Sequence, residues 1–115
     1  MGKMTIKGIF GIEHTLNNDI EKAIGILERT KIHVRDDSDT MWTSYDNGRE
    51  FRENIDDWIE RLKSKDVTVL IEIESAFYVA SSFQDHSLQN GWEKEYHDLA
   101  NQMDQCLAKL KRRLK

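Results

Sequence analysis

Proline is absent from this chain of 115 residues, cysteine occurs once, and long apolar runs are missing. Without proline the chain lacks the strongest marker of turns, so element boundaries must be inferred from glycine, asparagine and aspartate. The single cysteine, Cys106, excludes an internal disulfide framework and a zinc site built from several thiolates. No segment approaches the roughly 18 to 20 apolar residues needed to span a bilayer, and the first residues lack the apolar block of a secretory signal. We therefore expect a cytoplasmic protein that does not cross a membrane.

Hydrophobic residues make up 38% of the chain and charged residues 33%, which suits one domain with one core over residues 1–115. Residues 1–3 are given no structural weight, because Met4 offers a second start. The net charge of −4 is unevenly distributed: residues 1–108 hold 12 basic and 21 acidic side chains, whereas residues 109–115 carry five cations. An acidic body attracts cationic proteins and repels phosphates, so we expect no nucleic-acid partner. The basic end is expected to be a solvated helix end or tail.

Four short segments have the composition of β-strands, since they alternate apolar and polar residues or are rich in β-branched and aromatic side chains. They are Thr5–Glu13, Lys31–Arg35, Thr40–Tyr45 and Val67–Ile73. The second and third are separated by Asp36–Asp39, whose side chains favour a hairpin turn. The fourth also fits helical spacing through Leu70 and Phe77, but its β-branched residues favour a strand. If it is helical, the domain becomes mostly α-helical with one hairpin.

Three segments show the periodicity of amphipathic helices. The first ends near Thr30, the second covers about residues 49–64, and the third starts at Trp92 and runs to the basic end. Their apolar stripes are Leu16, Ile20, Ala23, Ile24 and Leu27; Phe51, Ile55, Trp58, Ile59 and Leu62; and Trp92, Tyr96, Leu99, Met103, Cys106 and Leu110. Trp58 and Trp92 are therefore expected in the core, each indole N–H bonded to an acceptor. The predicted fold is α+β, a small, mainly antiparallel sheet covered by three helices.

Residues 36–60 concentrate acidic and aromatic side chains and form the candidate binding surface. Nine acidic residues face only two basic ones there, and four large aromatic residues lie among them. Two of these aromatic residues belong to the helical stripe, which leaves Trp42 or Tyr45 to face a partner. An exposed ring among carboxylates suits an arginine- or lysine-rich surface. The predicted partner-binding residues are Asp36, Asp37, Asp39, Trp42, Tyr45, Asp46, Asp56 and Asp57. The alternative is a solvated acidic face with the aromatic residues in the core.

The sequence contains no catalytic or metal-binding motif. Its four histidines are widely spaced and form no metal-ligand pair at helical spacing. Asp37 and Asp39 resemble a cation-binding D-x-D pair, but a turn explains these residues better. Cys106 and His97 are about 13.5 Å apart along one helix, too far for a nucleophile and its base. We therefore expect a protein that is not an enzyme and that binds no metal or cofactor.

Two segments resemble a pattern of small bacterial domains whose function is uncharacterised. The first, Trp42–Asp46, fits W-x-S-W/Y-D. The second, Phe83–Trp92 followed by Glu95–Tyr96 and Leu99–Ala100, is similar to an L-Q-E segment that leads into N-G-W, an acidic-aromatic pair and L-A. The chain departs from the pattern at Val79–Ser81, where Pro-Thr-Gly is usual. The resemblance covers roughly the C-terminal two-thirds of the chain and implies no known chemistry.

Three accounts of function are compatible with the sequence. In the first, a small acidic domain binds a basic protein and inhibits it, as toxin-neutralising immunity proteins do. In the second, a small enzyme or ligand-binding domain uses Asp37, Asp39, Asp46 and His33 around the hairpin. In the third, the last helix pairs with its copy in a homodimer. The first account is preferred. The second lacks a catalytic motif, and the third needs the apolar stripe of the last helix, which the core of a single domain also needs.

Overall fold

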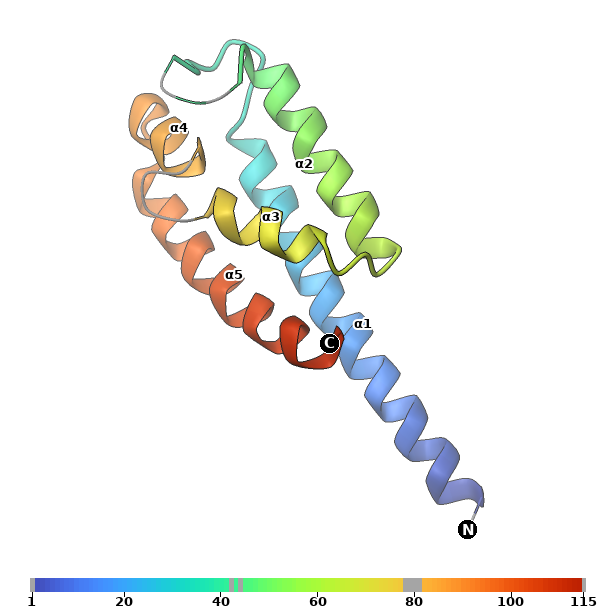
Figure 1. Cartoon of the computed structure of the whole chain (residues 1–115). Helices are drawn as coiled ribbons and strands as arrows, with labels where there is room; N and C mark the ends of the chain where they lie inside the picture. Colours follow the sequence, from blue (N-terminus) through green and yellow to red (C-terminus); the bar gives the residue numbers. More distant parts are fainter. Residues whose placement is uncertain (1, 42, 44, 78–81, 115) are drawn as a thin grey trace.

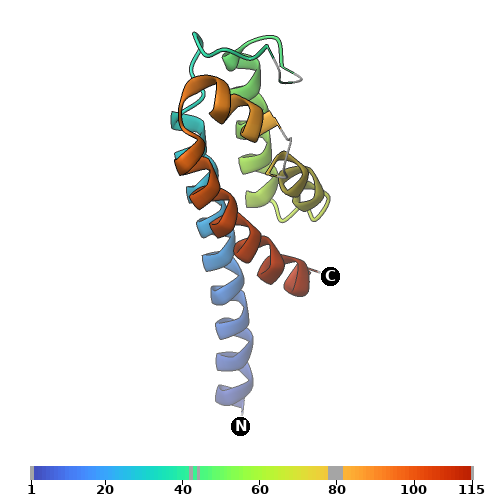
Figure 2. The same cartoon turned by 90° about the vertical axis from the view of Figure 1, so that its left-hand side faces the viewer.

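Five α-helices make up the described part of the chain, which in the computed structural model covers residues 2–41, 43, 45–77 and 82–114. They are α1 (Gly2–Ile32), α2 (Gly48–Lys63), α3 (Val69–Ala76), α4 (Ser82–Asn90) and α5 (Glu93–Leu114). α1 packs against both α2 and α5, and α3 crosses between α2 and α5 on the side opposite α1 (Figures 1 and 2). α4 lies at the end of the bundle, close to the loop that joins α1 to α2 (Figure 1).

The three longest helices bury the apolar stripes that their periodicity predicts. Ala23 and Leu27 of α1, Phe51 and Ile55 of α2 and Met103 of α5 are fully buried where these helices meet. The side chain of Asn47 begins α2 by accepting a hydrogen bond from the Glu50 amide at 2.8 Å. Gly91, with φ +78°, follows α4 in the left-handed conformation that commonly ends helices. Local signals and burial therefore agree for α2, for α5 and for α1 from Leu16 onward.

Phe83 of α4 lies at the centre of an aromatic cluster that joins α4 to α2 and to the end of α3. Its ring centroid is 5.0 Å from that of Phe51, 4.6 Å from that of Phe77 and 5.9 Å from that of Trp58. Both Trp58 and Trp92 are buried, as predicted, and Trp92 Nε1 donates a hydrogen bond to His86 Nδ1 at 2.9 Å. Trp58 Nε1 is buried and forms no hydrogen bond of ordinary geometry with a described residue, although it lies near enough to Glu72 to lower the pKa of that carboxyl.

The α+β prediction is wrong, because the described residues form helices and loops and contain no strand. Thr5–Glu13 lies within α1, and Lys31–Arg35 spans the end of that helix and the start of the following loop. There the amide of His33 donates to the carbonyl of Thr30, so a helical turn satisfies the backbone. The described residues of Thr40–Tyr45 form turns, and no hairpin is present among them.

Val67–Ile73 is also not a strand, because most of it forms the start of α3. Val69, Leu70 and Ile73 are buried on one face of that helix, while Val67 and Ile71 are exposed. This face closes the core between α2 and α5. Burial at helical spacing therefore outweighs the β-propensity of the branched side chains.

The N-terminal part of α1 projects beyond the other helices (Figures 1 and 2). A helix of 31 residues is about 46 Å long, and the molecule accordingly measures 59 Å by 23 Å by 21 Å. In the described part of the chain, no helix is both long enough and apolar enough to traverse a lipid bilayer.

Candidate functional site

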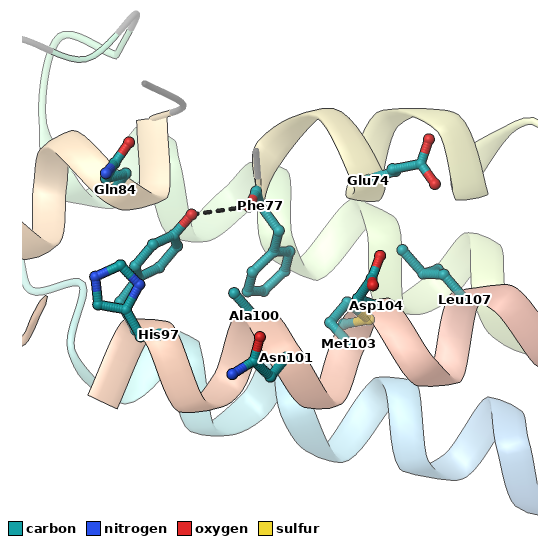
Figure 3. Close-up of a pocket in the computed structure, with 10 residues that line it drawn as sticks. Glu74, Phe77, Gln84, His97, Ala100, Asn101, Met103, Asp104 and Leu107 are labelled. Atoms are coloured by element: carbon teal, nitrogen blue, oxygen red, sulfur yellow. Dashed lines mark hydrogen bonds between the residues drawn. The ribbon is translucent and has the colours of Figure 1, made fainter. Parts of the chain in front are cut away.

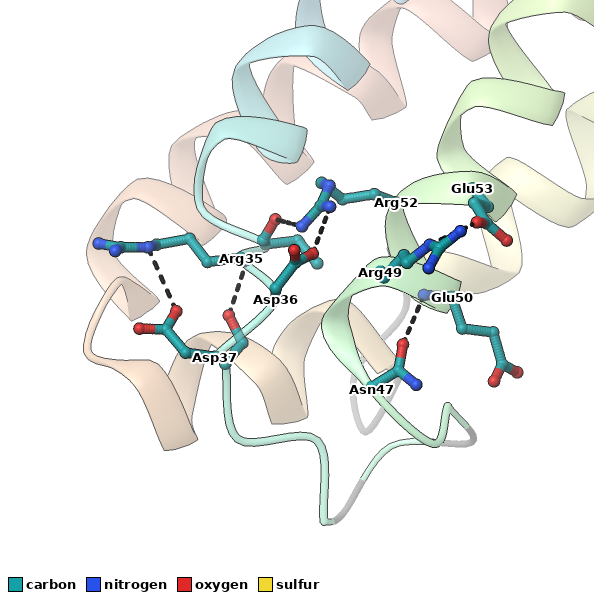
Figure 4. Close-up of polar contacts among 10 residues, drawn as sticks. Arg35, Asp36, Asp37, Asn47, Arg49, Glu50, Arg52 and Glu53 are labelled. Atoms are coloured by element: carbon teal, nitrogen blue, oxygen red, sulfur yellow. Dashed lines mark hydrogen bonds and ion pairs between the residues drawn. The ribbon is translucent and has the colours of Figure 1, made fainter.

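The predicted acidic surface centres on the loop that joins α1 to α2, here called the acidic loop (residues 35–47). Arg52 of α2 reaches back to this loop, where its Nη1 donates to the Val34 carbonyl at 3.2 Å and its Nη2 pairs with Asp36 (Figure 4). The Arg35 amide donates to Ser38 Oγ at 2.8 Å, which closes a tight turn. The first half of the loop is thus held against α2.

Asn90, the last residue of α4, fixes the middle of the acidic loop. Its Oδ1 accepts a hydrogen bond from the Asp39 amide at 2.9 Å, and its Nδ2 donates to the Asp39 carbonyl at 2.9 Å. Nδ2 also donates to the His86 carbonyl within α4, again at 2.9 Å. One side-chain amide therefore pairs with both backbone groups of Asp39 and joins the loop to α4.

Gly48, the first residue of α2, allows the beginning and the end of the acidic loop to approach closely. A Cβ at this position would lie 1.7 Å from the Arg35 carbonyl oxygen and 2.7 Å from its carbon. Both are backbone atoms, so a side chain at position 48 could be accommodated only by moving the loop. The sequence Asn47–Gly48 thus provides a helix cap and a site of backbone contact in two consecutive residues.

The eight predicted binding residues come from two parts of the chain. Five belong to the acidic loop, namely Asp36, Asp37, Asp39, Tyr45 and Asp46, and Trp42 lies outside the described residues. Asp56 and Asp57 lie farther along α2, about 13.5 Å from Asn47 for nine residues of helix. Asp56 pairs with Lys31 of α1 at 2.7 Å, and this hydrogen bond raises the pKa of the lysine. Asp57 pairs with Arg61 one turn away at 3.5 Å.

Several acidic groups of the loop already have partners in the chain. Asp36 pairs with Arg52, and Asp37 Oδ1 lies 3.3 Å from Arg35 Nε (Figure 4). Asp39 Oδ1 accepts a hydrogen bond from the Met41 amide at 3.0 Å and one from Gln89 Nε2 at 3.4 Å. Asp36 and Asp37 therefore contribute to the shape of the loop, while Asp39 and the exposed Asp46 are paired with no cation among the described residues.

Among the large apolar and aromatic side chains of the loop that the structure describes, Met41 rather than Tyr45 is presented to solvent. Met41 is 79% exposed, whereas the Tyr45 ring is half-buried and stacks on Phe51 with centroids 4.2 Å apart. Burial raises the pKa of the Tyr45 phenol, and the charge of Glu50 adds to this rise. Sequence reasoning missed Met41, although a methionine within a polar, aspartate-rich segment was an available signal.

A charged network near the far end of α2 connects that helix to α3. Arg61 lies 2.9 Å from Asp66 Oδ2 and 2.5 Å from Glu72 Oε2, and it also donates to Thr68 at 2.8 Å. Hydrogen bonds from Thr68 and then from Arg61 lower the pKa of Asp66, and the bond from Arg61 lowers that of Glu72. The network orders the α2–α3 turn, and its Glu72 also lines a cleft together with Tyr45 of the acidic loop.

Three clefts lined by described residues open between helices, and none of these three is lined by Asp37, Asp39, Asp46 or His33. His33 instead stacks on Trp92 with centroids 4.6 Å apart. The cleft between α3 and α5 has a volume of about 230 Å³ (Figure 3). Two acidic residues, Glu74 and Asp104, line it, and Glu74 pairs with Lys111. The described residues also contain no group of three or more histidine, cysteine, aspartate or glutamate side chains that could bind a metal.

His86 is a titratable side chain whose pKa is strongly changed by its surroundings. It is fully buried, and burial lowers its pKa to about 4, with a smaller contribution from nearby His33. Its Nδ1 accepts the hydrogen bond from Trp92, so the proton of the neutral ring resides on Nε2, which has no acceptor in the described structure. Gln89 and Asn90, which follow this histidine in α4, form hydrogen bonds with Asp39. The neutral histidine therefore lies directly beneath the acidic loop.

The sequence of the chain was compared with protein-family models and curated proteins, and its structure with solved structures. None of the three comparisons found a significant match. The resemblance to small bacterial domains based on Trp42–Asp46 and Phe83–Trp92 therefore stays a prediction. The site has to be interpreted from its own geometry.

Proposed function

We propose that this chain is a cytoplasmic protein-binding domain that uses the acidic loop to dock onto a cationic surface of another protein. The observation that carries the proposal is the 79% exposure of Met41 in a loop that hydrogen bonds hold on both sides. A loop that is already ordered loses little conformational entropy on binding, so more of its contact energy contributes to affinity. The free, buried thiol of Cys106 is compatible with a reducing compartment.

The chemistry around Met41 supports a basic partner. Methionine is flexible and polarizable, so it adapts to an apolar hollow on another protein. Asp39 and Asp46 are exposed on either side of it along the chain and can pair with arginine or lysine around such a hollow. Charge pairing of this kind accelerates association and favours basic over acidic partners. Inhibition of a basic effector would be one consequence of this docking.

The two other accounts of function receive less support from the structure. A homodimer through α5 would use Trp92, Tyr96, Leu99, Met103 and Leu110, and these side chains are at most 6% exposed within one chain. A catalytic site built from His33 and the loop aspartates would need a cleft that brings them together. In the described structure, His33 lies against Trp92 and the aspartates lie on the loop.

Site-specific photo-crosslinking tests the proposal. A photoreactive amino acid replaces Met41 in one protein and Asp98, exposed on α5, in a matched control. After irradiation in a lysate of the source cells, position 41 should give an adduct with one basic protein, identified by mass spectrometry. The double substitution Asp39→Asn and Asp46→Asn, added to the position-41 protein, should reduce that adduct at least tenfold, since it removes the two carboxylates proposed to contact the partner.

Three results would contradict docking through the acidic loop. One is the absence of any adduct from position 41. Another is the same set of adducts from position 98, which would indicate random encounters. The last is an adduct that persists unchanged when both aspartates are asparagine or when the salt concentration rises well above 0.15 M, where exposed charges are screened beyond about 8 Å.

A further inference from the structure

A groove with a different character from the acidic loop lies between α1 and α5. Its volume is about 360 Å³, near the lower end of the roughly 300–1,000 Å³ of small-molecule sites. Three of the residues that line it are cationic, namely Lys22 and Arg29 of α1 and Lys109 of α5. The protein as a whole is acidic, with a net charge of −4, so a groove lined by three cations differs in sign from the molecule's net charge.

The three cations of the groove are not neutralised by carboxylates among the described residues. No ion pair joins Lys22 or Lys109 to a described acidic side chain, and Arg29 donates only to the neutral Gly25 carbonyl and Gln102 Oε1, at 3.4 Å and 3.0 Å. The single acidic residue of the lining, Asp19, is 3% exposed and pairs with Arg113. The groove therefore has an uncompensated positive charge.

The thiol of Cys106 provides a second indication of where these cations lie. Burial raises the pKa of this thiol, and the charge of Asp19 adds to the rise. Lys22 of α1 and Lys109 of α5, which line the same groove as Cys106, lower the pKa of the thiol. An anion seated over Cys106 would lie between them.

Two bridges between the helices limit the length of the groove. Arg29 reaches across to Gln102 at one end, and Arg113 reaches across to Asp19 at the other. Ten residues of α1 separate these bridges, which corresponds to about 15 Å of helix. A small molecule fits between them, whereas an extended polypeptide would have to pass over one of the bridges.

Gly25 forms part of the groove wall and has no structural reason to be glycine. A Cβ at this position would have no neighbouring atom within 4 Å, and the φ angle of Gly25 is not positive. Glycine inside a helix destabilises it by about 1 kcal/mol relative to alanine. The missing side chain leaves the groove open between Lys22 and Arg29, which are three and four residues away along α1.

We propose that the α1/α5 groove binds a small phosphate-bearing molecule through Lys22, Arg29 and Lys109. Ammonium and guanidinium groups form short, charge-assisted hydrogen bonds with phosphate oxygens. Gln105, which also lines the groove, supplies an amide for the rest of the molecule. This site is independent of the acidic loop, so it adds a ligand to the domain irrespective of its protein partner.

A titration followed by two-dimensional ¹H–¹⁵N NMR tests the site at low ionic strength. The probes are inorganic phosphate and a nucleoside monophosphate, which distinguish a bare anion from a phosphomonoester with an organic group. Saturable shifts should be confined to residues around Lys22, Gly25 and Lys109. The double variant Lys22→Gln and Lys109→Gln should weaken binding at least tenfold, whereas Lys94→Gln, at the exposed start of α5, should change it less than twofold.

Gly25→Leu provides a variant that retains all three cations. Its side chain enters open space and improves helix propensity, so the protein should stay folded while the groove is filled and binding is lost. Equal binding by the wild type and Gly25→Leu would overturn the proposal, as would the absence of saturable shifts with both probes. Binding of an acidic glutamate peptide in the groove, with neither phosphate probe bound, would also overturn it.

Discussion

The acidic loop and the α1/α5 groove use charge in opposite ways. In the loop, Asp36 and Asp37 are paired with arginines of the same chain, so much of the negative charge holds the backbone in place. In the groove, Lys22 and Lys109 have no carboxylate partner among the described residues. An excess of one charge in the sequence therefore does not locate the charge that is free to bind another molecule.

The glycines of the two regions show the same contrast. Gly48 adjoins the acidic loop, where the Arg35 backbone occupies the space of a side chain, and Gly25 faces an open groove. The first is required by packing of the backbone, and the second is not. We therefore expect substitutions at Gly48 to destabilise the protein. Substitutions at Gly25 should leave the protein stable but change what the groove binds.

The largest effect is expected from Gly48→Ala. The new Cβ would lie 1.7 Å from the Arg35 carbonyl oxygen, so the acidic loop must separate from α2 and lose its hydrogen bonds to Arg52. The free energy of unfolding, measured by urea denaturation, should fall by about 3 kcal/mol or more. A decrease below about 1 kcal/mol would show that the loop yields easily and would remove the contrast between the two regions.

A pH dependence of similar size is expected from His86. Its pKa is about 4 in the folded protein and about 6.5 when unfolded, so between these values the unfolded chain binds a proton that the folded chain does not. Stability is therefore full above about pH 6.5 and decreases by about 3 kcal/mol as the pH falls to 4. Protonation of Nδ1 would also break the bond from Trp92.

Urea denaturation of wild type and His86→Gln across this pH range isolates the contribution of His86 from that of the carboxylates. Glutamine retains an acceptor for Trp92 Nε1 but does not titrate, so its stability should decline less between pH 6.5 and 4. If the free energy of unfolding fell equally with pH in both proteins, His86 would be protonated in the folded state as readily as in the unfolded state. Water would then reach this histidine beneath the acidic loop.

Asn90→Ala should have an intermediate effect that is confined to the loop end. It removes both hydrogen bonds to the Asp39 backbone and should lower the free energy of unfolding by about 1–3 kcal/mol. Hydrogen exchange of the Asp39 amide should accelerate more than that of amides in the middle of α5. Asn101→Ala, on the exposed face of α5, is the control and should change stability by less than about 0.5 kcal/mol.

Gly25→Ala should have the smallest effect and the opposite sign. A methyl group enters open space and alanine has the higher helix propensity. The free energy of unfolding, measured by urea denaturation, should therefore rise by about 0.5–1 kcal/mol. A destabilised Gly25→Ala protein would show that the groove closes around position 25 in solution. That result would argue against an open binding site there.

The sequence alone was enough to predict the helices whose apolar residues recur every three to four positions. The stripes of α2 and α5 were predicted correctly because long amphipathic segments repeat the same signal over several turns. The same reasoning predicted that Trp58 and Trp92 are buried. These features depend on residues close together along the chain.

Tertiary contacts decided the segments whose local signal was divided. Val69–Ala76 is helical because only a helix brings Val69, Leu70 and Ile73 onto the face that closes the core. The acidic loop takes its shape from Arg52 and Asn90, which are distant in sequence, and not from a hairpin turn at Asp36–Asp39. The pairing of acids with cations and the unpaired cations of the groove likewise depend on which helices are neighbours, because charges interact through space and not along the sequence.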